Sequence, residues 1–128
     1  MKLTFGKNEK LKSKKAIENL FSEGQSHVSR PVRIVYHIKP KEDYENKMGV
    51  SVAKKRFKHA ADRNLLKRRI REAYRLNKSL IEANENYSVD ILFIYTSSRI
   101  AEFETIDKAM KEVLEKLNEK IIKKEQPN

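Results

Sequence analysis

A chain of 128 residues has room for a single domain with one modest hydrophobic core, and because it contains no cysteine it cannot use disulfides, thiolate chemistry or a cysteine-based zinc site. Residues 1–78 hold 22 Lys or Arg against 8 Asp or Glu, a net charge of +14, and residues 79–128 hold 7 against 10, a net charge of −3. This segregation indicates an anionic partner, either nucleic acid or an acidic membrane surface.

We expect residues 1–128 to form one domain with flexible ends at 1–12 and 123–128. The N-terminus has no apolar signal core, and no run approaches the roughly 18 apolar residues that span a membrane. A cytoplasmic protein without a membrane partner is therefore expected.

A helix and a strand are the first predicted elements. Ser13 can cap a helix over Ser13–Gly24 that places Ile17, Leu20 and Phe21 on one face, and Gly24 suits the position after its end. Pro31–Pro40 then alternates apolar and polar residues, which predicts a half-buried strand. Its apolar face comprises Val32, Ile34, Tyr36 and Ile38, and only Val35 breaks the pattern. A short extra strand is considered around Ser26–Ser29.

The later elements alternate between strand and helix. Gly49–Ala53 predicts a second strand, antiparallel to the first, and Ala60–Lys78 predicts a basic helix. Ser88–Thr96 is nearly all apolar, as in a strand buried on both faces. Thr105 can cap the last helix, whose apolar stripe is Ile106, Met110, Val113, Leu117 and Ile121. The order α-β-β-α-β-α predicts an α+β sandwich with a mixed sheet.

The basic helix has two contrasting faces on a wheel of about 100° per residue. Leu66, Ile70 and Ala73 mark the apolar face, and the opposite arc carries Asn64, Lys67, Arg68, Arg71 and Arg75. Like charges at i,i+4 along this arc repel by a few tenths of a kcal/mol per pair. Phosphates would neutralise the row and release counterions. Lys54–Lys78 holds 11 basic and 2 acidic residues, which favours nucleic acid over a solvated face or a membrane.

These residues form a pattern that resembles the signature of the bacterial ribonuclease P protein subunit. It consists of Lys54-Lys55, then Arg63-Asn64, Lys67-Arg68, Arg71-Glu72 and Arg75. Gly49–Lys55 resembles the family's strand that leads into a basic loop, and the first helix ends with the matching residues Leu20, Phe21 and Gly24.

The resemblance implies a protein that assists a large catalytic RNA in removing the 5′ leader from precursor tRNA. The RNA would supply the catalytic centre and hold most of the Mg²⁺, and no obligate protein partner is expected. The implied fold is like domain 2 of ribosomal protein S5, with an uncommon left-handed β-α-β crossover.

The resemblance also implies two groups of site residues. The RNA-binding positions are Lys54, Lys55, Arg56, Arg63, Asn64, Lys67, Arg68, Arg71 and Arg75. The positions that line a leader cleft are Ile17, Phe21 and Tyr36. Single-stranded RNA is held by a basic groove and aromatic platforms, which suits these residue types. If the opposite strand face is the open one, Arg33, His37 and Lys39 replace Tyr36.

No active site in the protein itself is predicted. The three histidines are scattered without a second ligand at metal-binding spacing, and Asp90 is interpreted as the partner of a nearby cation. Three other functions stay open: a ribosomal-type structural RNA-binding protein, a duplex DNA-binding protein and a self-sufficient metal-dependent nuclease.

Overall fold

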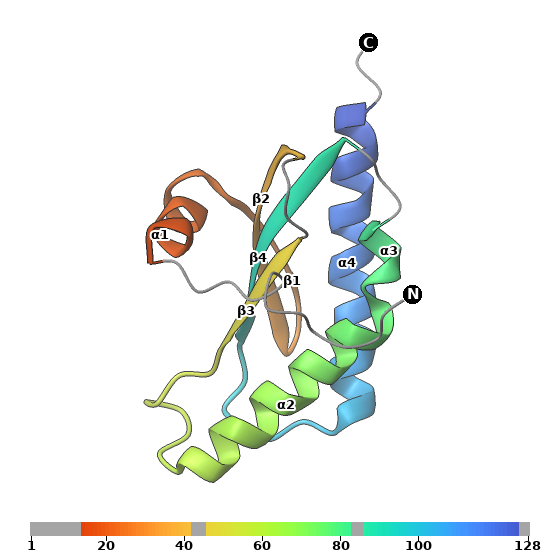
Figure 1. Ribbon diagram of the computed structural model, residues 1–128. Helices are drawn as coiled ribbons and strands as arrows, with labels where there is room; N and C mark the ends of the chain where they lie inside the picture. The colour runs from red at the N-terminus through yellow and green to blue at the C-terminus, as the bar shows by residue number, and fades with distance from the viewer. Residues whose placement is uncertain (1–13, 42–45, 83–85, 126–128) are drawn as a thin grey trace.

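The structure, a computed structural model, describes residues 14–41, 46–82 and 86–125, and every structural statement below refers to these ranges. It contains one sheet of four strands with helices on both sides (Figure 1). The elements are α1 (Lys14–Glu23), β1 (Gln25–Ser29), β2 (Val32–Pro40), β3 (Lys47–Ser51), α2 (Ala60–Asn77), α3 (Ser79–Glu82), β4 (Tyr87–Tyr95) and α4 (Phe103–Glu125). The α+β prediction is confirmed, whereas the predicted Ser13 cap lies outside the described residues.

The strand order in the sheet is β1-β2-β4-β3. The extra strand is confirmed as β1, which forms an antiparallel hairpin with β2. The predicted direction of β3, antiparallel to β2, is confirmed, but the two strands are not neighbours, because β4 lies between them. β4 is buried on both faces along most of its length and takes the central place, antiparallel to β2 and parallel to β3. The handedness of the β3-α2-β4 crossover stays a prediction.

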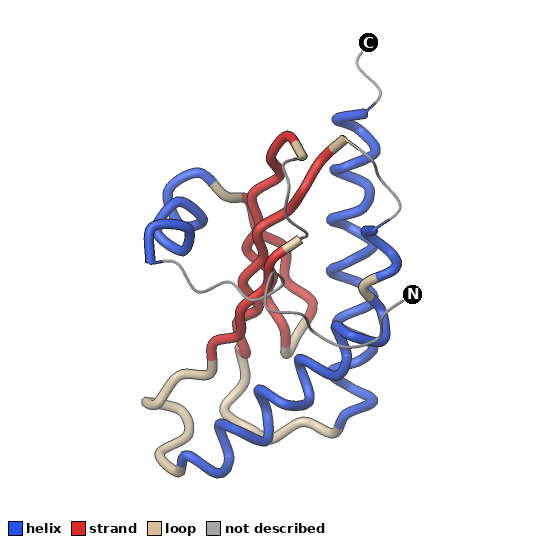
Figure 2. Tube along the Cα trace, viewed as in Figure 1, coloured by secondary structure: helices blue, strands red, loops and turns tan. Residues whose placement is uncertain are grey.

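Helices α2, α3 and α4 cover one face of the sheet, and α1 lies on the other face (Figures 1 and 2). The main core lies under the three helices and includes Ile34, Tyr36 and Phe93. A smaller cluster of Leu20, Val35 and Leu92 lies under α1. Val35 breaks the alternation of β2 because its side chain fills this second cluster.

Gly24 is required at the end of α1 by close packing. The helix ends at Glu23, as the sequence predicts, and no glycine among the described residues has a positive φ. A Cβ at Gly24 would clash with the carbonyl oxygen of Leu20 and would lie 2.9 Å from that of Tyr36. Only glycine therefore lets the chain turn from α1 into β1 against the neighbouring strand.

The last helix is longer than its sequence pattern predicts at both ends. It begins at Phe103, and the amide of Thr105 donates to the carbonyl oxygen of Glu102 at 3.1 Å, so the predicted cap at Thr105 is wrong. The helix continues to Glu125, so residues 123–125, expected in a flexible end, are helical. All five residues of the predicted apolar stripe are buried, which confirms its register.

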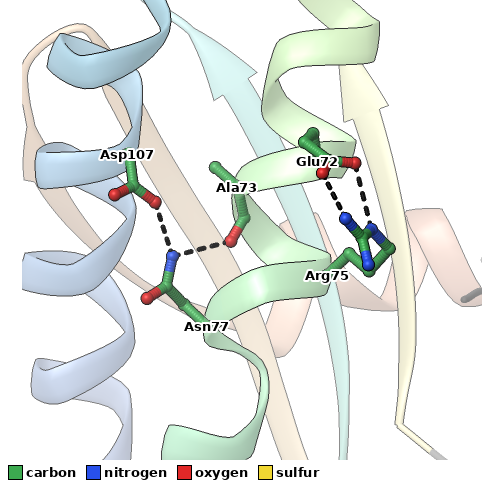
Figure 3. A network of polar contacts seen from close by, with 5 residues as sticks. All are labelled: Glu72, Ala73, Arg75, Asn77 and Asp107. Atoms are coloured by element: carbon green, nitrogen blue, oxygen red, sulfur yellow. Dashed lines mark hydrogen bonds and ion pairs between the residues drawn. The ribbon is translucent and has the colours of Figure 1, made fainter. Parts of the chain in front are cut away.

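A buried amide joins α2 to α4 (Figure 3). Asn77 is 8% exposed, and its Nδ2 donates to the carbonyl oxygen of Ala73 at 2.8 Å and to Oδ1 of Asp107 at 2.7 Å. Asp107 also pairs with Lys111 at 3.2 Å. The amide thus fixes the position of the basic helix relative to the helix behind it.

We expect Asn77→Ala to lower the free energy of unfolding by about 1–3 kcal/mol, because it leaves buried acceptors without their donor. The matched control is Asn64→Ala, the same substitution at an exposed position of the same helix, which should stay within about 0.5 kcal/mol of wild type. Urea unfolding of the three proteins measures both values, and equal stabilities would contradict a structural role for Asn77.

His27 should make the fold less stable as the pH falls. Burial, followed by the nearby Lys116 and Lys120, lowers the pKa of His27 from 6.5. The unfolded chain therefore binds the proton more readily, and the contribution of His27 to stability is present above pH 6.5 and is lost below it. Thermal unfolding of wild type and His27→Gln between about pH 7.5 and 5.5 tests this sign. Over this pH range the unfolding temperature of wild type should fall further than that of the variant. Equal falls in both proteins would contradict the prediction.

Candidate nucleic-acid interface

Helix α2 is fixed to the core by one face and presents the other to solvent. Leu66, Ile70, Ala73 and Tyr74 are buried, as the wheel predicts. On the opposite arc Asn64, Arg68 and Arg71 are exposed and Lys67 is half-buried. We call these four residues the cationic face. Its orientation follows from the sequence, because the apolar positions recur at helical spacing and select which side is buried.

The three cations of this face have no partner within the described part of the chain. Lys67, Arg68 and Arg71 make no hydrogen bond or ion pair to another described residue, whereas Lys39, Arg75 and Lys111 each pair with a carboxylate. The acidic residues of α4 therefore do not neutralise the cationic face. Such a row of like charges is stabilised when phosphates approach it.

Arg75, predicted to belong to the same row, is engaged by Glu72 (Figure 3). Its Nε donates to Oε2 of Glu72 at 3.0 Å, and a second nitrogen contacts the other carboxylate oxygen. The hydrogen bond from Arg75 lowers the pKa of Glu72, which keeps that carboxylate charged. A phosphate would have to compete with Glu72 for Arg75, and the predicted contact of Arg75 with RNA stays a prediction.

Three other arginines bind backbone carbonyl groups and order the loops around the start of α2. Arg63 donates to the carbonyl oxygens of Phe57 and Lys58 at 2.8 and 3.0 Å. Arg56 donates to the carbonyl oxygen of Thr96, and Arg69 to that of Ala101 at 2.6 Å. Lys54 and Lys55 are exposed on the loop between β3 and α2. Because a guanidinium has five donors, Arg56 and Arg63 keep donors beyond these bonds.

The predicted leader-cleft residues are not on one surface. Phe21 is 62% exposed on α1, and Ile17 is half-buried against the small cluster beneath that helix. Tyr36 is 1% exposed on the other side of the sheet, where its hydroxyl donates to Oε1 of Gln25 at 3.1 Å and lies 2.9 Å from Nε2 of His27. The prediction of Tyr36 as a stacking platform is therefore wrong, because its position in β2 points it into the main core.

The sheet face beside α1 carries polar residues instead. Arg33 is exposed on β2. Nε2 of His37, also on β2, lies 3.9 Å from Oε2 of Glu23 in α1. Lys39 contacts Asp90 at 3.0 Å, which confirms that Asp90 is the partner of a cation. By strand register the exposed Val28 of β1 belongs to the same face. Sequence reasoning missed Val28, because the short β1 segment carries no clear alternation.

Together the features define a class: a small α+β domain that offers folded nucleic acid an ordered cationic helix. No helix in the described ranges is long and apolar enough to cross a membrane. The comparisons with known proteins agree with this class and narrow it.

The family model for ribonuclease P matches residues 5–118. A ribonuclease P protein component from Porphyromonas gingivalis is 40% identical over 118 residues, which cover 87% of this chain and 85% of that protein. A ribonuclease P protein component from Clostridioides difficile is 35% identical over 115 residues, which cover 89% of this chain and 96% of that protein. The solved ribonuclease P protein of Staphylococcus aureus is 25% identical and superposes with a TM-score of 0.71 over 85% of this chain and 94% of that one. The chain therefore belongs to the ribonuclease P protein family, the protein subunits of a tRNA-processing nuclease that associate with ribonuclease P RNA.

Proposed function

We propose that the protein binds the catalytic RNA of ribonuclease P through the cationic face and through Lys54 and Lys55 of the adjoining loop. In the same complex the sheet face beside α1 holds the 5′ leader of precursor tRNA. The protein thereby assists endonucleolytic removal of the leader, which leaves the mature 5′ end of the tRNA.

The observation that carries this proposal is the unpaired row on α2. Lys67, Arg68 and Arg71 lie on a helix that is held in place by its buried side, and no described carboxylate contacts them. Arginine suits phosphate because its planar fork can donate two parallel hydrogen bonds. A row that is ordered before binding loses less conformational entropy when it meets phosphates than a flexible tail would.

Exposure of Phe21 supports the second part of the proposal. Its neighbour Leu20 is 1% exposed and anchors α1, whereas Phe21 is 62% exposed. An aromatic ring in this position can stack on unpaired bases without selecting their sequence. Arg33, on the same side of the sheet, adds a cation for the leader backbone. The buried Tyr36 has no part in this surface.

The chemistry of the reaction belongs to the RNA in this proposal. Among the described residues no group of three His, Cys, Asp or Glu could hold a metal ion. The cationic face offers Mg²⁺ a single neutral oxygen, that of Asn64, because its Lys and Arg side chains have only donors and positive charge where the ion needs oxygen ligands. In this proposal the RNA subunit holds most of the Mg²⁺ and supplies the catalytic centre.

Reconstitution tests the proposal. The protein is mixed with a bacterial ribonuclease P RNA at a Mg²⁺ concentration at which that RNA alone is slow, and cleavage of a precursor tRNA is followed. We expect faster cleavage at the correct 5′ position. The absence of any stimulation would overturn the proposal in favour of a structural RNA-binding protein. Multiple-turnover cleavage by the protein alone would overturn it in favour of a self-sufficient nuclease.

A further inference from the structure

We infer that a polar pocket at one end of the sheet is a second phosphate-binding site, separate from the cationic face, that receives a phosphate group carried by RNA. The pocket has a volume of about 470 Å³ and lies where three connections meet. These are the β1–β2 turn, the loop between β3 and α2, and the loop between β4 and α4, which converge at the lower end of the sheet in Figure 1.

The lining residues carry the chemistry that a phosphate requires. The pocket is lined by Arg30, Pro31, Arg56, Thr96, Ser97, Ser98, Ala101 and Thr105. It thus brings two guanidinium groups together with four hydroxyl groups, and no carboxylate is among the described lining residues. Charged N–H donors and hydroxyl donors are the groups that bind phosphate oxygens in proteins.

Several donors of the pocket are not used up within the protein. Arg30 is exposed and makes no hydrogen bond or ion pair to another described residue. Arg56 donates through Nη1 to the carbonyl oxygen of Thr96 and keeps further N–H groups. Oγ of Ser97 accepts from the amide of Arg99 at 3.0 Å, so its own proton can still be donated.

The walls of the pocket are held in place by hydrogen bonds. The amide of Thr96 donates to the carbonyl oxygen of Pro31 at 2.8 Å and ties the β1–β2 turn to the end of β4. The hydroxyl of Tyr95 accepts from the amide of Ala101 at 2.9 Å and donates to the carbonyl oxygen of Arg99 at 2.5 Å. A site that is ordered before binding loses less conformational entropy when the ligand enters.

The position of the pocket identifies the source of its ligand. Arg56 belongs to the loop that carries the exposed Lys54 and Lys55, and the carbonyl of the lining residue Ala101 accepts a hydrogen bond from Arg69 of α2. The pocket therefore borders the proposed RNA surface. The assignment of the phosphate to RNA rests on the proposed function, whereas the phosphate site itself does not.

The test uses the ¹⁵N-labelled full chain, titrated with inorganic phosphate at constant ionic strength. We expect saturable shifts of the Ser97 and Ser98 amide signals in wild type, and about tenfold weaker binding in Arg30→Gln, because a charged donor is lost. Arg99→Gln is the control, since it removes the same charge from an exposed residue of the same loop that does not line the pocket. It should bind within about twofold of wild type. Shifts that do not saturate, or equal losses in both variants, would overturn the site whether or not ribonuclease P activity is found.

A competition experiment identifies the ligand. Short single-stranded RNA with a 5′-phosphate and the same RNA with a 5′-hydroxyl are added to the phosphate-bound protein. Displacement by both supports a backbone phosphodiester, and displacement by the phosphorylated RNA alone supports a terminal phosphate. If neither RNA displaces phosphate, the assignment of the site to RNA is overturned.

Discussion

Replacing Arg68 and Arg71 together by alanine is expected to weaken binding of the protein to ribonuclease P RNA and to flatten its salt dependence. Each phosphate contact that is lost should lower the slope of log K against log salt concentration by about one unit. Both side chains are exposed and have no described partner, so the free energy of unfolding should change by no more than about 0.5 kcal/mol. Filter binding from about 50 to 200 mM salt measures the slope.

Lys108→Ala combined with Lys123→Ala is the matched control for the two arginines. Both lysines are exposed on α4, and their removal changes the net charge of the protein by the same amount. We expect the control to keep the wild-type slope, because α4 lies behind the cationic face and makes no proposed contact with RNA. Equal slopes for both double variants would show that only the total charge matters.

The second large effect is expected from Phe21→Ala. If Phe21 stacks on a base of the leader, the variant should bind a precursor tRNA with a long leader about 5- to 150-fold more weakly, the equivalent of about 1–3 kcal/mol. Its affinity for mature tRNA should stay unchanged, because mature tRNA has no leader. Affinities for both RNAs, measured in the presence of the ribonuclease P RNA, give the comparison.

Leu20→Ala supplies the contrast to Phe21→Ala on the same helix. Leu20 is 1% exposed in the small cluster under α1, so truncation should lower the free energy of unfolding by about 2–5 kcal/mol. Phe21→Ala should unfold close to wild type, since its ring is 62% exposed. A large loss of stability in Phe21→Ala with equal effects on both RNAs would contradict a leader contact.

Local periodicity is sufficient to predict most elements of this fold. The alternation over Pro31–Pro40 predicts β2, the continuous apolar run predicts a strand buried on both faces, and helical spacing predicts which residues of α2 and α4 are buried. The secondary structure and the buried face of each of these elements depend on the spacing of apolar residues along the chain. The sequence order therefore predicts them directly.

Strand pairing and the exposed face of each strand could not be obtained in the same way. β2 and β3 are neighbours in the chain, but β4 separates them in the sheet, and nothing in the short β3 segment specifies its partner. The sequence does not show which helix covers the strand face that carries Tyr36. In the structure α4 covers that face and α1 covers the opposite one. Val35 is explained only by this second layer.

The same limit applies to the site. The spacing on α2 predicts that Lys67, Arg68 and Arg71 share a face, and the structure agrees. Spacing does not show which cations are already engaged. Arg75 pairs with Glu72 three residues earlier, and Arg63 turns back to the loop carbonyls, because rotamers and nearby acceptors decide these contacts. The phosphate pocket is formed by three segments that are distant in sequence, so no local sequence motif predicts it.

The most direct measurement of the central claim is cross-linking from the cationic face to ribonuclease P RNA. The chain contains no cysteine, so a single Asn64→Cys variant carries a photo-activated cross-linker at one defined position without loss of a cation. Lys108→Cys, on the exposed side of α4, carries the same reagent as the control. We predict cross-links to the RNA from position 64 and none from position 108. Efficient cross-linking from position 108 with none from position 64 would contradict the account.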